Sequence, residues 1–558
     1  MIKKIMLLIV FLVFAVSICA QGPGQPRKFT HADTLRGAVT KERSWWDLQY
    51  YHLNIKVDPA DSSIAGTNTI RYKVLSKYQV MQVDLQQPFK ILSFSQNGQQ
   101  LKYTQDGNAY FVQLDKEQIP GAVNDLKVEY YGKQAPPSKT PGPGRRFGAI
   151  SWNKDSKGNP FISSACEGSG ASLWWPCKEH WYDEPDSVLL SITVPDNLMD
   201  VSNGRLRSVV KNPDKTATYN WFISNPINNY CVSINIGNYV HFSEVYKGEK
   251  GNLDCNYYVL PEDLDKAKEQ FKDAKRMLDA FEYWFGPYPF YEDGYKLVEV
   301  SYAGMEHQSA VTYGNKFKNG YLEKDVSHTN IGFKFDFIII HESSHEWFGN
   351  NITAKDIADM WIHESFGAYS ENIFVNYHYG KKESAEYVIG TRANIRNDRP
   401  IIGIYGVNYQ GPLDMYYKGA NVLHTLRQIV NDDEKWRSVL RGLNKTFYHQ
   451  TVTAGQIENY IMQETGLKLR AFFDQYLRTV KVPAFEYALE GKTMKYRWNN
   501  IIDGFDMQLN VNINGIDKIL YPAAEWKQIE VGEGAKIVPD INYYVTSTDL
   551  NAKTETNK

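Results

Sequence analysis

Cysteine is scarce in this sequence and is not grouped. Only 5 of the 558 residues are cysteine, and four of these follow the first twenty residues. None of the four has a C-x-x-C or Cys-His spacing that would hold a metal, and four in so long a chain do not form a disulfide scaffold. Their positions are compatible with buried free thiols and equally with one or two bridges. The four are Cys166, Cys177, Cys231 and Cys255.

An excess of charge of either sign is also lacking. The chain has 62 basic and 64 acidic residues, which gives a net charge of −2. Binding to nucleic acid or to an anionic membrane surface requires clustered positive charge. We therefore expect no nucleic-acid partner.

Long hydrophobic runs are absent apart from one near the start. Lys3 and Lys4 precede an apolar run over residues 5–16, which ends in small residues at Ala20. This order is typical of a secretory signal peptide over residues 1–20, and the run is too short to span a bilayer comfortably. No later segment is apolar for long enough to be a membrane helix. We expect an exported protein, periplasmic or extracellular, without a stable membrane span.

A length of 558 residues predicts two to four domains. After the first twenty residues, the periodicity of the apolar residues changes twice. Alternating apolar and polar residues predict an antiparallel β saddle or sandwich, helical spacing then dominates, and the alternation returns at the end. The loop "PPSKTPGPG" (136–144) interrupts the first β region. The fold class is multidomain α+β. The expected ranges are an N-terminal extension 21–44, a β domain 45–243, a mainly α domain 244–480, a small β-sandwich 481–552 and a polar tail 553–558.

The segment His341-Glu342-Ser343-Ser344-His345 is an H-E-x-x-H sequence. On a helix, residues four apart are offset by only about 40°, so both imidazoles point to one side and can share one Zn²⁺. The apolar run 333–340 is suited to bury such a helix, and we expect the helix to end at Gly349.

A catalytic zinc needs a third protein ligand and an open position. Glu364 follows His345 by nineteen residues and lies within a second helical pattern. A short turn between two antiparallel helices would return its carboxylate to the metal. The sequence therefore predicts one zinc ion per chain, held by His341, His345 and Glu364.

At this point the sequence resembles the M1 family of zinc metallo-aminopeptidases, whose signature is H-E-x-x-H-x18-E. The segments "HESSHEWFGNNIT" and "MWIHESFGAYSE" carry the signature, "YAGMEH" is similar to the family's G-x-M-E-N motif, and "MYYKGA" to its Y-x-K-G motif. "LWWPCKE" matches a conserved region before them. The resemblance implies a thermolysin-like catalytic domain between two β domains. It also implies a short form without the large C-terminal helical domain, so we expect an open cleft or one closed by a partner subunit.

The resemblance assigns roles to individual residues. It implies that Glu342 takes a proton from the water that zinc activates and passes it to the leaving amine, while zinc and Tyr416 stabilise the oxyanion, with Tyr417 as the fallback. Two acids, Glu306 and Glu167, would bind the free α-ammonium of a peptide. The remaining implied substrate contacts are the main chain at Ala303 and Gly304, together with Met305.

Two residues depart from the family pattern. His307 replaces an asparagine after Glu306, which alters the hydrogen bonding around that acid. His363 replaces an asparagine before Glu364 and acts either in support of the metal site or as a packed helix residue.

The function predicted from these features is an exported aminopeptidase that acts on oligopeptides with a free N-terminus. Alternatives are a zinc endopeptidase or dipeptide-releasing peptidase, a bifunctional hydrolase that also opens a lipid epoxide, and a non-catalytic zinc-binding scaffold. Glu306 and Glu167 argue against an endopeptidase, because an internal peptide bond offers no ammonium. The intact Glu342 and Tyr416 argue against a scaffold. The sequence indicates no particular oligomeric state.

Overall fold

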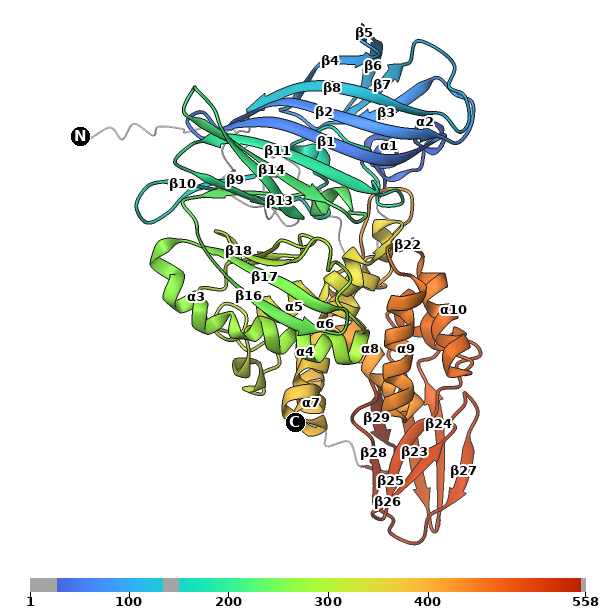
Figure 1. Cartoon of the computed structure of the whole chain (residues 1–558). Coiled ribbons are helices and arrows are strands. Elements are labelled where there is room, and N and C mark those ends of the chain that lie inside the picture. Colours follow the sequence, from blue (N-terminus) through green and yellow to red (C-terminus); the bar gives the residue numbers. More distant parts are fainter. Residues whose placement is uncertain (1–27, 134–149, 553–558) are drawn as a thin grey trace, which may run out of the picture.

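The structure is a computed structural model that describes residues 28–133 and 150–552. Three regions follow one another along the chain: β-sheets at the top of Figure 1, helices with a mixed sheet in the middle, and a smaller β region at the lower right. The predicted α+β class, in the order β, α, β, is confirmed. The expected signal peptide (1–20), the loop 136–144 and the tail 553–558 lie outside the described residues, and the domain limits stay predictions.

The first region is built on an eight-stranded sheet of order β13-β14-β11-β1-β2-β8-β4-β5. Its central strand β1 alternates between buried and less buried positions, as half-buried sheets do. Sheets of order β12-β15-β10-β9 and β3-β7-β6 pack with it. The strands are β1 (Trp46–Asp58), β2 (Ser63–Val74), β3 (Val80–Asp84), β4 (Lys90–Gln96), β5 (Gln99–Gln100), β6 (Lys102–Asp106), β7 (Ala109–Gln113), β8 (Val123–Lys133), β9 (Ile150–Lys154), β10 (Pro160–Ser164), β11 (Ser187–Pro195), β12 (Met199–Ser202), β13 (Arg205–Lys211), β14 (Thr216–Ile223) and β15 (Ile234–Gly237).

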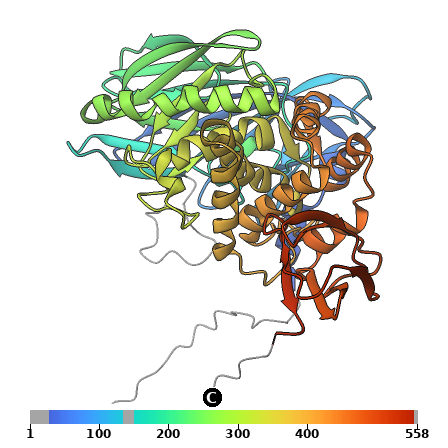
Figure 2. The ribbon, with the colours of Figure 1, turned by 90° about the horizontal axis from the view of Figure 1, so that it is seen from below.

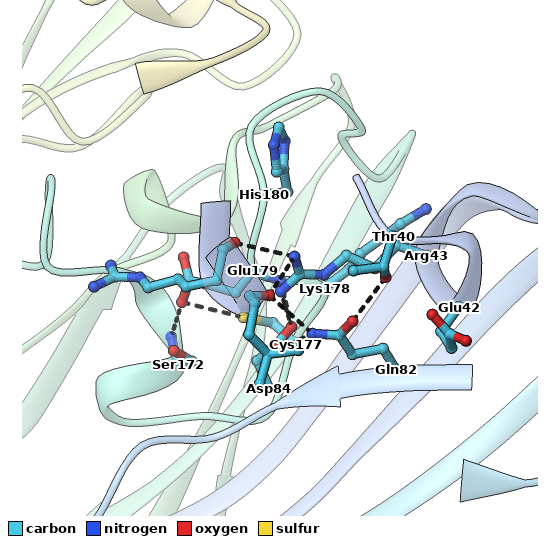
Figure 3. A network of polar contacts seen from close by, with 12 residues as sticks. Thr40, Glu42, Arg43, Gln82, Asp84, Ser172, Cys177, Lys178, Glu179 and His180 are labelled. Carbon is cyan, nitrogen blue, oxygen red and sulfur yellow. Dashed lines mark hydrogen bonds and ion pairs between the residues drawn. The ribbon is translucent and has the colours of Figure 1, made fainter. Parts of the chain in front are cut away.

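Two short helices, α1 (His31–Gly37) and α2 (Lys41–Ser44), precede this β region. They are joined to it by a buried polar network in which Arg43 of α2 reaches Asp84 at the end of β3 (Figure 3). The Arg43 side chain is fully buried. Its two terminal nitrogens donate to carbonyls at the end of α1 and to Asp84, so this buried network ties both helices to the β region.

The middle region begins with a five-stranded sheet of order β16-β17-β18-β20-β19, in which β19 is an edge strand. The helix α6 lies within this region and is buried over residues 361–375. Figure 2 shows the molecule from below. The strands are β16 (Val240–Gly248), β17 (Gly251–Val259), β18 (Tyr295–Glu299), β19 (Gly304–Met305), β20 (Val311–Tyr313), β21 (Ile352–Ala354) and β22 (Gln450–Val452). The helices are α3 (Leu264–Gln270), α4 (Lys272–Phe285), α5 (Phe337–Ser344), α6 (Trp361–Tyr379), α7 (Lys381–Gly390), α8 (Asp414–Val430), α9 (Asp433–Thr446), α10 (Ala454–Thr465) and α11 (Arg470–Arg478).

The last region consists of two small sheets, of orders β27-β24-β23-β29 and β26-β25-β28. The Tyr476 hydroxyl of α11 donates to the Tyr544 carbonyl at 2.7 Å, which ties this region to the helices. No helix within 28–133 or 150–552 is both long and apolar enough to cross a bilayer. The strands are β23 (Ala484–Glu490), β24 (Thr493–Asn499), β25 (Leu509–Ile513), β26 (Ile516–Leu520), β27 (Lys527–Glu530), β28 (Ile537–Pro539) and β29 (Thr546–Asp549).

The cysteines fit the first of the two expectations drawn from the sequence. Cys166, Cys177, Cys231 and Cys255 are all free and buried. Burial raises the pKa of the Cys231 thiol well above its usual value. The four behave as small apolar side chains in the core rather than as crosslinks.

Candidate active site

The helix α5 carries the H-E-x-x-H sequence and begins at a clear cap. The Asp336 side chain accepts from the backbone N–H groups of Ile338 and Ile339, which satisfies donors at the start of the helix. The helix ends at Ser344, five residues before the expected end at Gly349. A wide turn follows, in which Gly349 has a φ of +134°, a conformation that favours glycine.

Both predicted histidine ligands are oriented by contacts at their Nδ1 atoms. His341 Nδ1 lies 2.8 Å from Glu371 Oε1, and His345 Nδ1 lies 3.0 Å from the Phe348 carbonyl oxygen. Each contact is a donation from Nδ1–H, so both Nε2 atoms present a lone pair to the same side. The two Nε2 atoms are 3.4 Å apart. The break after α5 thus serves the site, because the turn supplies the carbonyl that orients His345.

Glu364 is returned to these histidines by α6. The connection is longer than the expected simple turn: it contains β21 and the 3-10 turn Ile357–Asp359 before α6 begins. Glu364 Oε2 lies 3.5 Å from His341 Nε2 and 3.6 Å from His345 Nε2.

The triangle formed by these three atoms fits a metal ion. Three donors on one face of a tetrahedral zinc with bonds of about 2.0–2.2 Å lie about 3.3–3.6 Å apart, which matches the observed edges. Glu364 Oε2 is buried and has no hydrogen-bond partner in the described part of the chain. Room is provided by Gly367, where a Cβ would lie 2.9 Å from His345 Cε1. Within the described residues, His341, His345 and Glu364 are the one group arranged to hold a metal.

Glu342 lies on α5 beside the triad and against the edge strand β19. A Cβ added to Gly304 would lie 3.0 Å from Glu342 Cγ and 2.6 Å from Ile338 Cγ2, so only glycine lets the strand approach the helix this closely. Burial and the nearby Glu306 raise the pKa of Glu342 to about 8, although the histidine at 341 opposes this. A divalent cation at the triad would lower it.

The two predicted amine-binding acids converge on the same place from different regions. Glu306 follows β19, and Glu167 lies on the turn after β10. Burial, followed by the charges of Glu306 and Glu364, raises the pKa of Glu167 well above its usual value. One carboxylate oxygen of each, Glu167 Oε1 and Glu306 Oε1, is buried without a hydrogen-bond partner in the described chain.

The backbone of Ala303, Gly304 and Met305 runs along the outer edge of the sheet. Gly304 and Met305 pair with β20 on one side only, and the Ala303 carbonyl accepts from Gly314 N–H at 2.8 Å. A strand at a sheet edge can pair with an added extended segment on its other side. The structure therefore places an available strand edge beside Glu342 and Glu306.

Tyr416, and not Tyr417, has its hydroxyl at the triad. It donates to Glu364 Oε1 at 2.7 Å, and its ring stacks near His341 with centroids 5.8 Å apart. Two other residues of the same motif explain the position: Lys418 Nζ donates to Asn397 Oδ1, and Gly419 lies against Ser365 of α6. Gly419 thus lets α8 pack closely on α6, and Tyr416 directs its hydroxyl at Glu364, a predicted metal ligand.

The two histidines that depart from the family pattern differ in their surroundings. His307 is fully buried, and in the described structure neither ring nitrogen has a hydrogen-bond partner; burial lowers its pKa to about 3. His363 Nε2 accepts from Ala354 N–H at 2.9 Å and its ring stacks on Trp181. His363 therefore packs α6 against β21 and does not reach the triad.

A comparison with protein families matches residues 269–476 to the peptidase family M1 domain. The matched range contains the triad, Glu342, Glu306 and Tyr416, and excludes Glu167. Residues 269–476 therefore form a peptidase family M1 domain.

The relatives of this chain are distant. It is 24% identical over 300 residues to endoplasmic reticulum aminopeptidase 1 of Mus musculus, covering 51% of this chain and 31% of that protein. It is 21% identical over 427 residues to the leucyl aminopeptidase of Saccharolobus solfataricus, covering 72% and 50%. The chain thus spans a third to a half of the length of these relatives.

A solved structure has the same fold over a greater part of both chains than the sequence relatives cover. An M1 zinc metallopeptidase from Deinococcus radiodurans superposes with a TM-score of 0.65 at 19% identity, covering 79% of this chain and 95% of that one. A mutant of that protein, bound to a Tyr-ser-ala substrate, gives the same TM-score.

Sequence reasoning missed Glu371 and Tyr387. Glu371 lies on α6 and orients His341, and its other oxygen, Oε2, accepts from the Tyr387 hydroxyl at 2.6 Å. A signal was present, because Glu371 follows Glu364 by seven residues and so lies on the same face of α6. Tyr387 comes from the separate helix α7 and left no such signal.

Proposed function

We propose that this chain is a zinc-dependent aminopeptidase that removes N-terminal residues from oligopeptides. One observation carries the proposal: three buried carboxylate oxygens converge without a partner, on Glu364, Glu306 and Glu167. Buried carboxylates that lie close together keep their negative charges only where cations compensate them. One metal ion at the triad compensates Glu364, and the ammonium of a peptide compensates the other two.

Zinc is the metal that the donor set favours, since two imidazoles and one carboxylate with an open position form a catalytic zinc site. When bound, it supplies a Lewis acid that polarises the scissile carbonyl and makes water more acidic. The zinc metallopeptidase named among the structural neighbours supports this assignment.

The chain's own residues then handle the protons. Glu342, beside the triad, removes a proton from the attacking water as the new carbon–oxygen bond forms, and gives that proton to the amide nitrogen as the carbon–nitrogen bond breaks. Tyr416 carries an O–H donor next to the proposed metal ligand Glu364, and its role is to donate to the negative oxygen that develops on the substrate.

The N-terminal end of the substrate is fixed by two further features. The edge of β19 aligns the substrate main chain by strand addition, and Gly304 keeps this edge close to Glu342. Glu306 and Glu167 hold the ammonium by charge-assisted hydrogen bonds. This arrangement supports an exopeptidase, because an internal residue of a peptide would leave both acids uncompensated.

The test uses purified protein with aminoacyl-p-nitroanilides and their N-acetylated counterparts. Cleavage of the free-amine substrates only, abolished by a chelator and restored by zinc, is the expected result. Equal cleavage of acetylated substrates would contradict the exopeptidase assignment, and full activity after chelation would contradict the metal assignment.

We also propose that the protein is exported. The support is the charged start, apolar run and small-residue exit of residues 1–20. Expression of the full chain in a bacterial host, followed by N-terminal sequencing of the protein from the exported fraction, tests this. Removal of about twenty residues is expected, and an intact N-terminus on protein retained in the cytosol would refute export.

A further inference from the structure

The turn that carries Glu167 is held by hydrogen bonds from three other parts of the chain. One of these is weak, with Asn408 Nδ2 at 3.5 Å from the Gly168 carbonyl oxygen. Gly168 and Gly170 have φ values of +65° and +92°, so the turn is tight and depends on glycine. The Gly168 carbonyl accepts from Arg36 Nη2 at 3.0 Å, and the Ser169 carbonyl accepts from Gln86 Nε2 at 2.9 Å. Arg36 therefore supplies a charged donor to the carbonyl of the residue directly after Glu167.

Arg36 lies in the last turn of α1, and α1 is itself rigidly placed. The Nη1 atom of the buried Arg43 donates to three carbonyls at the end of this helix, and its Nη2 donates to Asp84 at 2.7 Å (Figure 3). Charged donors at a helix C-terminus satisfy carbonyls that the helix leaves unpaired. The three carbonyls are those of Leu35, Arg36 and Ala38.

The same helix also contacts the middle region of the molecule. A Cβ added to Gly37 would lie 2.0 Å from Asn408 N, so α1 packs directly on the backbone of the segment 403–411. His180 Nε2 donates to the Gly37 carbonyl at 3.1 Å, and the Phe29 and Tyr409 rings meet edge-on at 5.6 Å. The helix α1 thus lies between the first β region and the middle region, next to the turn that carries Glu167.

From this juxtaposition we propose that Arg36 is a positioning residue for the substrate ammonium. It acts by holding the turn that presents Glu167. The sequence assigned no role to residues 21–44. Within the described part of this extension, α1 holds the turn, and the buried Arg43–Asp84 network holds α1. The inference rests on the proposed aminopeptidase function, because it requires Glu167 to bind the amine.

The experiment compares Arg36→Ala and Arg36→Lys with the wild type on a leucyl-p-nitroanilide series. Loss of the charged donor frees the turn, so Arg36→Ala is expected to raise KM on the order of tenfold, with kcat changed less than about twofold. Arg36→Lys keeps one charged donor and should give a smaller rise. The control is Arg71→Ala, which removes a guanidinium paired with Asp125 on the exposed face of β2 and should match the wild type.

A second measurement does not depend on turnover. Hydrogen–deuterium exchange of peptides covering residues 166–173 should be faster in Arg36→Ala than in the wild type, while peptides over α5 and α6 stay unchanged. Melting temperature and zinc content verify that each variant is folded and loaded. If Arg36→Ala does not fold, Arg36→Lys decides the test. A folded variant with a loosened turn must show both a higher KM and faster exchange over residues 166–173.

The outcomes separate the inference from the proposed function. Unchanged exchange over 166–173, or faster exchange with an unchanged KM, overturns the positioning role. A fall in kcat with no change in KM overturns it as well, because it would place the effect on the chemical step. A wild type that cleaves no free-amine substrate refutes the aminopeptidase proposal instead, and the exchange data then still decide whether Arg36 holds the turn.

Discussion

Glu342 follows the proposed metal ligand His341 in the sequence but is not one of the three proposed ligands. Its role can therefore be tested separately from metal binding. We predict that Glu342→Gln retains stoichiometric zinc and loses turnover by about 10²–10⁴-fold, since an amide cannot take up the proton from water. Metal analysis and kcat on the same preparation measure both. Loss of zinc along with activity would show that Glu342 is a ligand or supports one.

Glu371 contacts His341, a proposed metal ligand, and is not itself one of the three proposed ligands. Partners that orient a ligand histidine change metal affinity by about 10–100-fold. Glu371→Gln keeps an acceptor but removes the charge, so we expect zinc to dissociate about tenfold more readily in a competition with a chelating dye. Tyr387→Phe removes only the hydroxyl that donates to Glu371 and should have a smaller effect. Equal affinities in all three proteins would refute this role.

At the scale of elements, the approach of α8 to α6 decides where Tyr416 lies. A Cβ on Gly419 would be 1.9 Å from Ser365 Oγ, so the two helices cross in contact at this glycine. Gly419→Ala should force them apart, destabilise the protein by about 1–3 kcal/mol, and lower kcat by moving Tyr416 away from Glu364.

The control for this substitution is Gly455→Ala in α10, where an added Cβ has nothing nearer than 3.9 Å. Alanine is the better helix former, so this variant should be neutral or slightly stabilising. Melting temperature and kcat for both variants give the comparison. A Gly419→Ala protein with the wild-type kcat would show that the helix crossing does not set the tyrosine position.

The elements of the site differ in how far the sequence predicted them. The H-E-x-x-H spacing predicts two imidazoles on one helix face, because helix geometry is local. The end of α5 at Ser344 was not predicted. The turn that follows this helix supplies the Phe348 carbonyl that orients His345, and nothing in the spacing of the sequence indicates this contact.

Contacts distant in sequence were beyond prediction. Arg36 and Gly168 are 132 residues apart, and no periodicity or spacing links them. The same holds for Tyr387 and Glu371, and for the surroundings of His307. The choice of Tyr416 over Tyr417 came from the family motif, and local helix geometry alone did not distinguish them.

At the scale of the whole molecule, His424 lies where α8 meets the last β region. Its Nε2 donates to Asn542 Oδ1 at 3.0 Å. Burial, assisted by Arg427 and Arg392, lowers the pKa of His424 to about 4, although the Asn542 contact opposes this. The unfolded chain therefore takes up this proton first as pH falls.

Because the unfolded chain takes up this proton first, a falling pH destabilises the folded protein through His424. The contribution of His424 to stability is present above pH about 6.5 and is lost as pH falls toward 4, by about 3 kcal/mol at most. His424→Gln should therefore lose less stability than the wild type between pH 7 and pH 4.5, measured as the shift in urea midpoint. The control His31→Gln lies in an exposed pair with Asp106 and should keep the wild-type shift. An equal shift in His424→Gln would contradict this assignment.

The whole site depends on the claim that buried acids recognise a free amine. The most direct test is the ratio of kcat/KM for leucyl-p-nitroanilide to that for its N-acetylated form, in the wild type and in Glu306→Gln. The account predicts a high ratio in the wild type and a large fall in Glu306→Gln, caused by a rise in KM for the free-amine substrate with zinc retained. A ratio that stays high in Glu306→Gln would show that this carboxylate does not read the amine, and would contradict the account.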